Sequence, residues 1–427
     1  MNTLWFLVYN IIIYPLLIFI FTILSIINGK ARSGFIGRFS TQSKLNKYFS
    51  KISIKPNIYW FHSASLGEFN QLLPVLEGVK KVEPDSVAIV SFFSSSGYQN
   101  ASSKLIDLKI YLPFDFLWSV NKALDTVSPK KLVFAAYDLW PNLIWSAKRK
   151  NIHTNIFASR IKDDSYKMKP IFRIFYQSIY RSFSTIYTIS EKDRSSLAGM
   201  IGKENTPRLR VLGNPRFDMV KKSADSFSEE KKGDILSRDA RLILASMHDE
   251  DDQTIFPAVW ELLKIFPELK ILYVPHEPSS AVVRRYRNIF EGKGFEPYTI
   301  TDKKNSKLPD ARVVIIGIVG ILPKLYWQGK IAYIGGGFST GIHNVMEPAV
   351  AGLPVIFGPD YKHFQEAEDL LDSGGGFTID SNESFRNTFE SLFTNEEYFL
   401  ESSTAAKNVI ERNLGSANRI VGSLIND

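Results

Sequence analysis

The first 29 residues of the chain carry no charged side chain, and the stretch from Leu4 to Ile27 is almost entirely apolar. As an α-helix, a run of this length crosses the ~30 Å hydrocarbon core of a membrane. A cleaved signal peptide would instead begin with basic residues and have a shorter apolar region that ends in small residues. The segment has neither feature, so the sequence predicts a single-pass transmembrane anchor over residues 1–29.

A basic patch follows this anchor, and Glu68 is the first acidic residue of the chain. The formal net charge is +8, and the patch supplies all but +1 of it, so the charge gives no reason to expect a nucleic acid as a partner. Positive residues beside a membrane span stay on the cytoplasmic side, which places the remaining chain at the cytoplasmic face. The patch either binds an anionic membrane surface as well or only sets the topology. Its members are Lys30, Arg32, Arg38, Lys44, Lys47, Lys51 and Lys55.

Short apolar runs alternate with longer segments of helical periodicity along the rest of the chain. Most runs are continuously apolar, as expected of parallel strands covered on both faces, and the segments between them are long enough for crossover helices. The sequence therefore predicts an α/β protein with doubly wound, Rossmann-like sheets. The strands are expected at Ile58–Phe61, Val87–Phe92, Lys109–Leu112, Leu132–Ala136, Thr154–Phe157, Thr185–Ile189, Leu209–Leu212, Leu242–Ala245, Lys270–Val274, Arg312–Ile316, Ile331–Ile334 and Val355–Phe357.

A polar, charged segment from Lys221 to Ala240 interrupts this pattern and is nearly free of large apolar residues. It predicts an N-terminal domain over residues 30–220 and a C-terminal domain over residues 221–427. The alternative is an exposed helix within one domain. Two doubly wound domains in tandem bind ligands at the carboxyl ends of their strands, across a cleft, so the residues that follow strands are the candidates for a site.

Glu68 is the first of these candidates. It lies in the segment Trp60–Asn70, after a predicted strand and in the first turn of a predicted helix. A carboxylate at this place can act as a general base on an incoming hydroxyl. The alternative is that Glu68 only complements the helix dipole, worth ~0.3–1 kcal/mol, and the same dipole would lower its pKa.

Asp138 is the second candidate. It follows the predicted strand Leu132–Ala136 and stands just before Trp140 and Pro141, which end the strand and begin the next helix. We expect its carboxylate to face the cleft as a catalytic residue. The alternative is a helix cap beside a packed tryptophan.

A glycine-rich segment, Gly335–Pro354, follows the predicted strand Ile331–Ile334. Glycines allow close approach of the backbone, and Asn344 can cap a helix whose free N–H groups suit a phosphate. Glu347 lies one turn inside that helix and can accept hydrogen bonds from ribose hydroxyls. The segment therefore predicts a nucleotide site, and the alternative is a plain glycine-rich turn.

No metal site is expected from the sequence. The chain has no cysteine, which excludes thiolate ligands, disulfides and a thiol nucleophile. Its one dense acidic run, Asp249–Asp252, is interpreted as the capped start of a solvated helix.

Six segments of the chain occur in the order seen in Kdo transferases, and the chain resembles this family over nearly its whole length. These membrane-anchored enzymes of lipopolysaccharide synthesis transfer 3-deoxy-D-manno-octulosonic acid (Kdo) and have the two-domain GT-B fold. The segments are Ser65–Glu68, Asp138–Asn142, Gly213–Asp218, Ser246–His248, Val274–Pro278 and His343–Pro348.

The resemblance implies an inverting glycosyltransferase that moves Kdo from CMP-Kdo to a hydroxyl of a lipid A precursor at the inner membrane. Glu68 takes the role of general base. No cofactor is implied, because the donor is a monophosphate and leaves no diphosphate for a metal to neutralise. The residues implied to hold the cytidine nucleotide are Pro275, His276, Val319, Gly320, Ile321, Asn344, Val345, Met346 and Glu347.

Three positions depart from the family pattern. The family commonly has arginine where His276 stands, glutamate where Asp138 stands, and a more polar turn than Val319–Ile321. His276 lacks the permanent charge and the bidentate fork of an arginine, so phosphate binding is expected to depend more on backbone N–H groups. Two other functions stay open: another GT-B enzyme at the same membrane, such as a UDP-sugar transferase or a related epimerase, and a non-enzymatic scaffold with a decayed GT-B fold.

Overall fold

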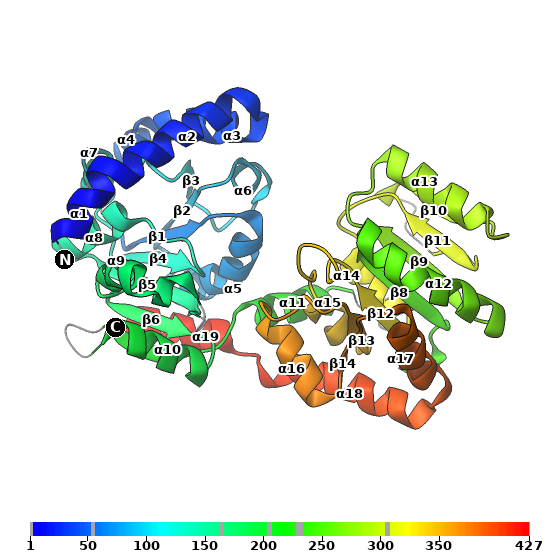
Figure 1. Ribbon diagram of the computed structural model, residues 1–427. Helices are drawn as coiled ribbons and strands as arrows, with labels where there is room; N and C mark the ends of the chain where they lie inside the picture. The colour runs from blue at the N-terminus through cyan, green and yellow to red at the C-terminus, as the bar shows by residue number, and fades with distance from the viewer. Residues whose placement is uncertain are drawn as a thin grey trace. The chain divides into compact units, whose positions relative to one another are not determined.

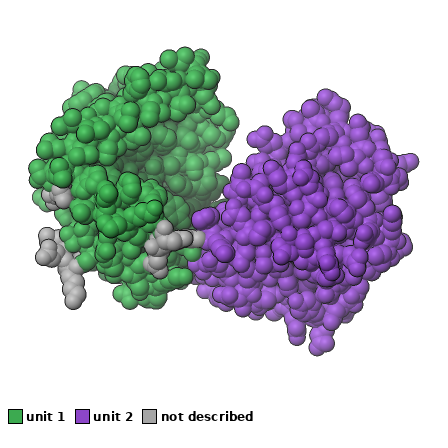
Figure 2. Space-filling model, in the orientation of Figure 1, with its two compact units in different colours: residues 1–219, 415–427 green, residues 220–414 purple. Residues whose placement is uncertain are grey.

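The computed structural model describes residues 3–52, 56–161, 165–202, 207–227, 234–303 and 308–426, and the chain divides into two compact units (Figures 1 and 2). Unit 1 contains residues 1–219 and 415–427, and unit 2 contains residues 220–414. The C-terminal helix α19 (Ser416–Asn426) therefore belongs to unit 1, although the predicted second domain extends to residue 427. It packs against α5 (Leu66–Val82), where Ile420 and Leu424 are fully buried.

Unit 1 is built on a parallel sheet in the order β3-β2-β1-β4-β5-β6-β7, with helices on its faces (Figure 1). Its strands are β1 (Ile58–Ser63), β2 (Val87–Phe92), β3 (Leu108–Tyr111), β4 (Lys131–Ala135), β5 (His153–Ser159), β6 (Thr185–Thr188) and β7 (Arg208–Val211). Its other helices are α1 (Thr3–Val8), η1 (Tyr9–Ile13), α2 (Tyr14–Ile27), α3 (Gly29–Phe39), α4 (Thr41–Phe49), α6 (Ser95–Asn100), α7 (Leu117–Val127), α8 (Pro141–Arg149), η2 (Tyr166–Met168), α9 (Pro170–Tyr180) and α10 (Glu191–Ile201), while α11 (Arg216–Asp225) crosses the division between the units.

Unit 2 has a second parallel sheet, in the order β10-β11-β9-β8-β12-β13-β14. Its strands are β8 (Arg241–Met247), β9 (Lys270–Pro275), β10 (Tyr298–Ile300), β11 (Val313–Ile316), β12 (Ile331–Ile334), β13 (Val355–Phe357) and β14 (Gly376–Thr378). Its helices are η3 (Ile235–Ser237), α12 (Asp249–Ile265), α13 (Ser280–Glu291), α14 (Leu322–Leu325), η5 (Tyr326–Gln328), α15 (Met346–Val350), α16 (Gln365–Ser373), α17 (Asn382–Thr394) and α18 (Glu396–Arg412).

The predicted fold class is confirmed, since both sheets are parallel and doubly wound. Central strands such as β1 and β4 are buried along their whole length, which is why they read as continuous apolar runs. Every predicted strand is present, and the prediction missed β10 and β14. Both are three residues long and lie at the edges of the second sheet, where a strand needs little apolar sequence.

Each sheet has one place where the strand order reverses. In unit 1, β2 and β3 lie on one side of β1 and the later strands lie on the other side, so the strand order reverses between β1 and β4. In unit 2 the strand order reverses between β8 and β12. In open parallel sheets, ligands bind outside the carboxyl ends of the strands at such a reversal. These two edges are therefore where the site residues should lie.

The N-terminal helical segment, Thr3–Ile27, is long and apolar enough to cross a membrane by length and composition, with a mean hydropathy of 2.5. It nevertheless packs along one side of unit 1, as α1 and α2 show in Figure 1. Tyr9 and Tyr14 are buried there, and the Tyr9 hydroxyl donates to Asp115 Oδ2 over 2.8 Å. The predicted anchor is therefore part of unit 1 and not a separate segment. The opposite side of the segment exposes Leu4, Leu7, Ile11, Ile12, Leu16, Leu17, Phe19, Ile20, Ile23, Leu24, Ile26 and Ile27.

The basic patch divides into buried and exposed members. Arg38 is buried, with its guanidinium over the ring of Phe93, and Lys44 donates to the hydroxyl of Tyr98. These two side chains therefore form contacts within unit 1. Lys30, Arg32, Lys47 and Lys51 are exposed, and Lys55 lies outside the described residues.

Candidate active site

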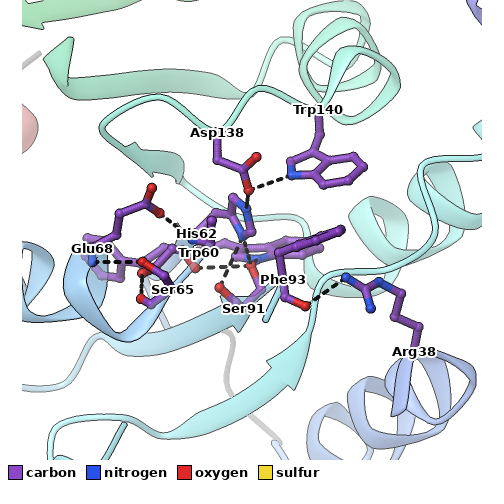
Figure 3. A network of polar contacts seen from close by, with 12 residues as sticks. Arg38, Trp60, His62, Ser65, Glu68, Ser91, Phe93, Asp138 and Trp140 are labelled. Atoms are coloured by element: carbon purple, nitrogen blue, oxygen red, sulfur yellow. Dashed lines mark hydrogen bonds and ion pairs between the residues drawn. The ribbon is translucent and has the colours of Figure 1, made fainter. Parts of the chain in front are cut away.

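Glu68 lies at the carboxyl end of β1, in the first turn of α5, as predicted. Ser65 caps this helix, since its hydroxyl accepts a hydrogen bond from Glu68 N over 3.3 Å. The Glu68 side chain turns back, and its Oε2 accepts a hydrogen bond from Ala64 N over 2.5 Å. The turn therefore holds the carboxylate beside the end of the central strand, where Figure 3 shows it near His62 and Asp138.

Burial raises the pKa of Glu68 to about 7. The hydrogen bond from Ala64 N and the proximity of His62 act in the opposite direction, and the charge of Asp138 adds to the rise. The pKa is therefore raised overall, because removal of water from the carboxylate outweighs the backbone hydrogen bonds of Ala64 and Ser65, which lower it. A carboxylate with a pKa near the working pH is well suited to general base catalysis.

Asp138 follows β4, on the other side of the strand reversal from Glu68. Its Oδ2 accepts hydrogen bonds from Trp140 Nε1 over 2.9 Å and faces His62 Nε2 at 2.8 Å (Figure 3). The alternative role as a helix cap is excluded, because Asp115 accepts from Asn142 N and Leu143 N at the start of α8. Asp138 thus directs its carboxylate to the edge of the sheet that also carries Glu68.

His62 is a buried part of this site that the sequence did not single out. Its Nδ1 lies 3.1 Å from the carbonyl oxygen of Ser91 and 3.0 Å from Ser91 Oγ, and that hydroxyl also accepts from Trp60 Nε1. A carbonyl oxygen only accepts, so Nδ1 carries a hydrogen. The Nε2 atom of His62 faces Asp138 Oδ2 at 2.8 Å. A histidine directly after the apolar run Ile58–Phe61 is the sequence signal that could have identified it.

An aromatic layer extends the network toward the N-terminal helices. The Trp140 ring stacks on Phe93 at a centroid distance of 5.1 Å (Figure 3). The Arg38 guanidinium lies 4.4 Å from the centroid of the Phe93 ring and donates to Phe93 O over 2.9 Å. Asn142, two residues after Trp140, exchanges amide hydrogen bonds with Asn10 of the N-terminal segment. The loop that carries Asp138 is therefore held from both α3 and the apolar N-terminal helix.

Two left-handed residues lie near the carboxyl ends of β4 and β8. Ala136 has φ 59° and stands two positions before Asp138, and Ser246 has φ 56° and stands two positions before His248. Such conformations cost roughly 1–3 kcal/mol in residues other than glycine and are concentrated at functional sites. Both turns redirect the chain at the carboxyl edge of a sheet.

In unit 2, the predicted donor residues lie at the carboxyl edge of the sheet. Pro275 ends β9, His276 follows it and is exposed, and the turn Val319–Ile321 lies between β11 and α14. Gly320 has φ +85°, and Val319 is 64% exposed. These residues therefore share one edge, although they come from separate strands.

Asn344 and Glu347 form a local pair after β12. The Asn344 side chain accepts from Met346 N over 3.1 Å and donates to Glu347 Oε1 over 2.9 Å. The N-cap of the short helix α15 is Val345, so Asn344 lies one position before it and is not the predicted helix cap. The Asn344 side chain instead orients the carboxylate of Glu347. Val345 and Met346 are fully buried, so their side chains face the core of unit 2.

The glycines of this segment serve internal packing. A side chain at Gly335 would meet the carbonyl oxygen of Ser246 at 2.4 Å, and one at Gly337 would meet the backbone of Gly358 at 2.6 Å. The close approach that these glycines allow is therefore between parts of unit 2.

The acidic run Asp249–Asp252 also differs from its interpretation as a solvated helix start. Asp251 accepts hydrogen bonds from the Tyr333 hydroxyl and from Gly336 N, and Asp252 is buried against Tyr273 and Tyr286.

Three histidines meet at the carboxyl ends of β8, β9 and β12, and the sequence did not identify them as a set. His248 Nε2 and His343 Nε2 are 2.8 Å apart, and the His276 ring stacks on both, at centroid distances of 4.5 and 4.4 Å. Burial and the other histidines lower the pKa of His343 to about 4, and burial and His248 also lower the pKa of His276. These shifts favour the neutral form of His276, which therefore does not supply the permanent charge of an arginine.

Comparison with protein families gives one match in the N-terminal half. Residues 30–219 match the family model described as 3-deoxy-D-manno-octulosonic-acid transferase (kdotransferase). Proteins named 3-deoxy-D-manno-octulosonic acid transferase are among the relatives. The one from Chlamydia pneumoniae is 29% identical over 80% of this chain and 78% of its own length, and the one from Aquifex aeolicus is 27% identical over 78% of this chain and 86% of its own length.

Solved structures agree with the fold. A UDP-GlcNAc 2-epimerase from Neisseria meningitidis, bound to UDP-GlcNAc, superposes with a TM-score of 0.62 at 14% identity, over 87% of this chain and all of that one. A second UDP-GlcNAc 2-epimerase structure, from Methanocaldococcus jannaschii, has a TM-score of 0.53 at 15% identity, over 87% of this chain and all of that one. At this level of identity the likeness establishes only the architecture, in which two doubly wound domains follow one another.

Proposed function

The chain belongs to the Kdo transferase family of glycosyltransferases, and we propose that it moves Kdo from CMP-Kdo to a hydroxyl of a lipid A precursor, with inversion at the anomeric carbon. Glu68 carries this proposal. It is a partly buried carboxylate with a pKa of about 7, and it stands at the strand reversal of unit 1. A family of hydroxyl-glycosylating enzymes requires a base of this kind.

In the proposed reaction, the Glu68 carboxylate takes the proton of the acceptor hydroxyl. The hydroxyl oxygen forms a bond to the anomeric carbon of Kdo while the bond from that carbon to the CMP phosphate oxygen breaks, and CMP leaves with the electron pair. Attack on the face opposite the leaving group inverts the configuration. The His62–Asp138 pair lies beside the base, and the negative charge of Asp138 helps to keep the pKa of Glu68 high.

For the donor, we propose the residues of unit 2 that follow its strands. Glu347, oriented by Asn344, would accept hydrogen bonds from the ribose hydroxyls. His276 would lie beside the phosphate with Pro275, and the turn Val319–Ile321 would complete the nucleotide pocket through its backbone. Val345 and Met346 would contribute backbone groups only, because their side chains are buried.

We also propose that the protein works at the cytoplasmic face of the inner membrane, on an acceptor confined to that membrane. The exposed apolar side of Thr3–Ile27 suits lipid, and the exposed lysines suit anionic head groups. The contacts of Tyr9, Asn10 and Tyr14 with unit 1 favour a segment that lies at the membrane surface. A single-pass crossing would require these buried polar contacts to separate.

The experiment that tests the function is incubation of the full chain in detergent with CMP-Kdo and lipid A precursor, followed by mass spectrometry of the lipid. The expected result is a lipid heavier by Kdo, with release of CMP. Parallel reactions with UDP-GlcNAc and the same acceptor are expected to give no product and no epimer. A product or epimer from UDP-GlcNAc, with none from CMP-Kdo, would refute the proposal.

A further inference from the structure

The three histidines of unit 2 form a cluster of nitrogen atoms with the spacing of a metal site. One ligand atom from each of His248, His276 and His343 lies within 4.8 Å of the other two. In a tetrahedral zinc site, Zn–N distances of about 2.0–2.1 Å place the ligand atoms roughly 3.3 Å apart. His248 Nε2 and His343 Nε2 are 2.8 Å apart, a hydrogen-bond distance, so a bound ion would replace their direct contact and move the two nitrogens slightly apart.

The three rings are held by separate and rigid elements. His248 follows β8 and begins α12, His276 follows β9, and His343 ends the glycine-rich turn after β12. The backbone fixes two of these positions further: His276 N donates to Met247 O, and His343 N donates to Gly335 O. The convergence therefore follows from the order of three neighbouring strands in the sheet.

The neighbouring carboxylates form hydrogen bonds and an ion pair with other residues. Asp251 accepts from Tyr333 and from Gly336 N, and Asp249 forms an ion pair with Arg285. Neither side chain is needed to complete the cluster. Three protein nitrogens and one open position are the arrangement of catalytic zinc sites, in which the fourth ligand is water or a substrate atom.

We propose that His248, His276 and His343 bind a divalent first-row transition metal ion, with Zn²⁺ as the reference ion. Imidazole nitrogen is a preferred ligand of zinc, copper and nickel. No cysteine or acidic motif of the chain points to a metal, so the sequence alone predicts no metal site. Resting on the proposed function, the open position would take a phosphate oxygen of the donor.

The site is tested with the untagged full chain in detergent, after removal of metal by a chelator. Calorimetry is expected to show one Zn²⁺ bound per chain, and Co²⁺ is expected to give the visible absorption of a tetrahedral nitrogen-rich site. The absence of both signals in the wild-type protein would overturn the proposal, and this result depends on no variant.

Variants then locate the ion. Loss of a group that merely supports a ligand costs ~10–100-fold in metal affinity, so His248→Ala, His276→Ala and His343→Ala should each weaken Zn²⁺ binding at least tenfold. His363→Ala, an exposed histidine of the same unit, is the matched control and should bind Zn²⁺ as the wild type does. Unchanged affinity in any of the three variants would overturn a three-histidine site.

A titration with CMP separates this inference from the proposed function. CMP should bind more tightly to the Zn²⁺-loaded protein than to the metal-free protein. Binding of CMP without any Zn²⁺ binding would overturn the metal site and leave the donor assignment in place. Binding of Zn²⁺ without any CMP binding would overturn the donor assignment and leave the metal site in place.

Discussion

The pH dependence of transfer should follow the titration of Glu68. Burial raises the pKa of this carboxylate to about 7, and the base acts only when it is deprotonated. The rate constant kcat/KM should therefore rise with pH through about 7 and level off above it. With this pKa, about 9% of the enzyme is active at pH 6 and about 91% at pH 8, a ratio of about tenfold. With an ordinary glutamate pKa, the same ratio would be nearly 1.

The assay is the initial rate of CMP release from CMP-Kdo, with detergent-dispersed acceptor at concentrations below KM. Circular dichroism at each pH controls for unfolding. Asp138→Asn removes a negative charge that raises the pKa of Glu68, so the midpoint of the rise should move to lower pH. Asp107→Asn, in the same unit but paired with Lys80, is the matched control and should leave the midpoint in place. A flat profile between pH 5 and 8 in the wild type would refute the reasoning about the base.

Three further predictions concern the N-terminal helix, the donor residues and the membrane surface. Tyr9→Phe removes a hydrogen bond to a buried carboxylate, which should destabilise unit 1 by about 1.5–3 kcal/mol, whereas the exposed Tyr166→Phe should have little effect in the same thermal unfolding experiment. Glu347→Ala should raise the CMP dissociation constant about tenfold or more in calorimetry, because it removes an acceptor for the ribose. Glutamine at both Lys47 and Lys51 should lower activity on acceptor in anionic vesicles but not in detergent, and added salt should reproduce that loss.

Each of these has an outcome that contradicts it. Equal thermal stability of the two tyrosine variants would mean that the N-terminal segment does not support unit 1. Unchanged CMP affinity in Glu347→Ala would remove this residue from the donor site. An equal loss of activity in detergent and in vesicles would mean that the exposed lysines help to build the acceptor site itself.

Much of the architecture could be predicted because buried parallel strands leave a clear pattern. β1 and β8 are continuous apolar runs, and the residues that follow them lie at the carboxyl edge of a sheet without further information. Glu68 and Asp138 were found in this way. The short edge strand β14 was missed because three residues of modest apolar character, Gly376–Thr378, carry no such signal.

Contacts between distant segments could not be predicted. The hydrogen-bond partners of Tyr9 and Asn10 are more than 100 residues away in the sequence. The sequence therefore predicts an isolated membrane span, although the segment packs against unit 1. The histidine cluster depends on the order of strands within the sheet, which a list of strands does not provide. The direction of the change in the Glu68 pKa depends on burial, which the sequence does not show and which here outweighs the backbone hydrogen bonds to the carboxylate.

The most direct test of the central claim is the variant Glu68→Gln, which keeps the size of the side chain and removes the base. Its CMP affinity and its thermal stability should match those of the wild type, because the predicted nucleotide residues belong to unit 2. Its rate of Kdo transfer, measured from product masses over time, should fall roughly 10²–10⁴-fold. Near-normal transfer by this variant would contradict the assignment of Glu68 as the general base.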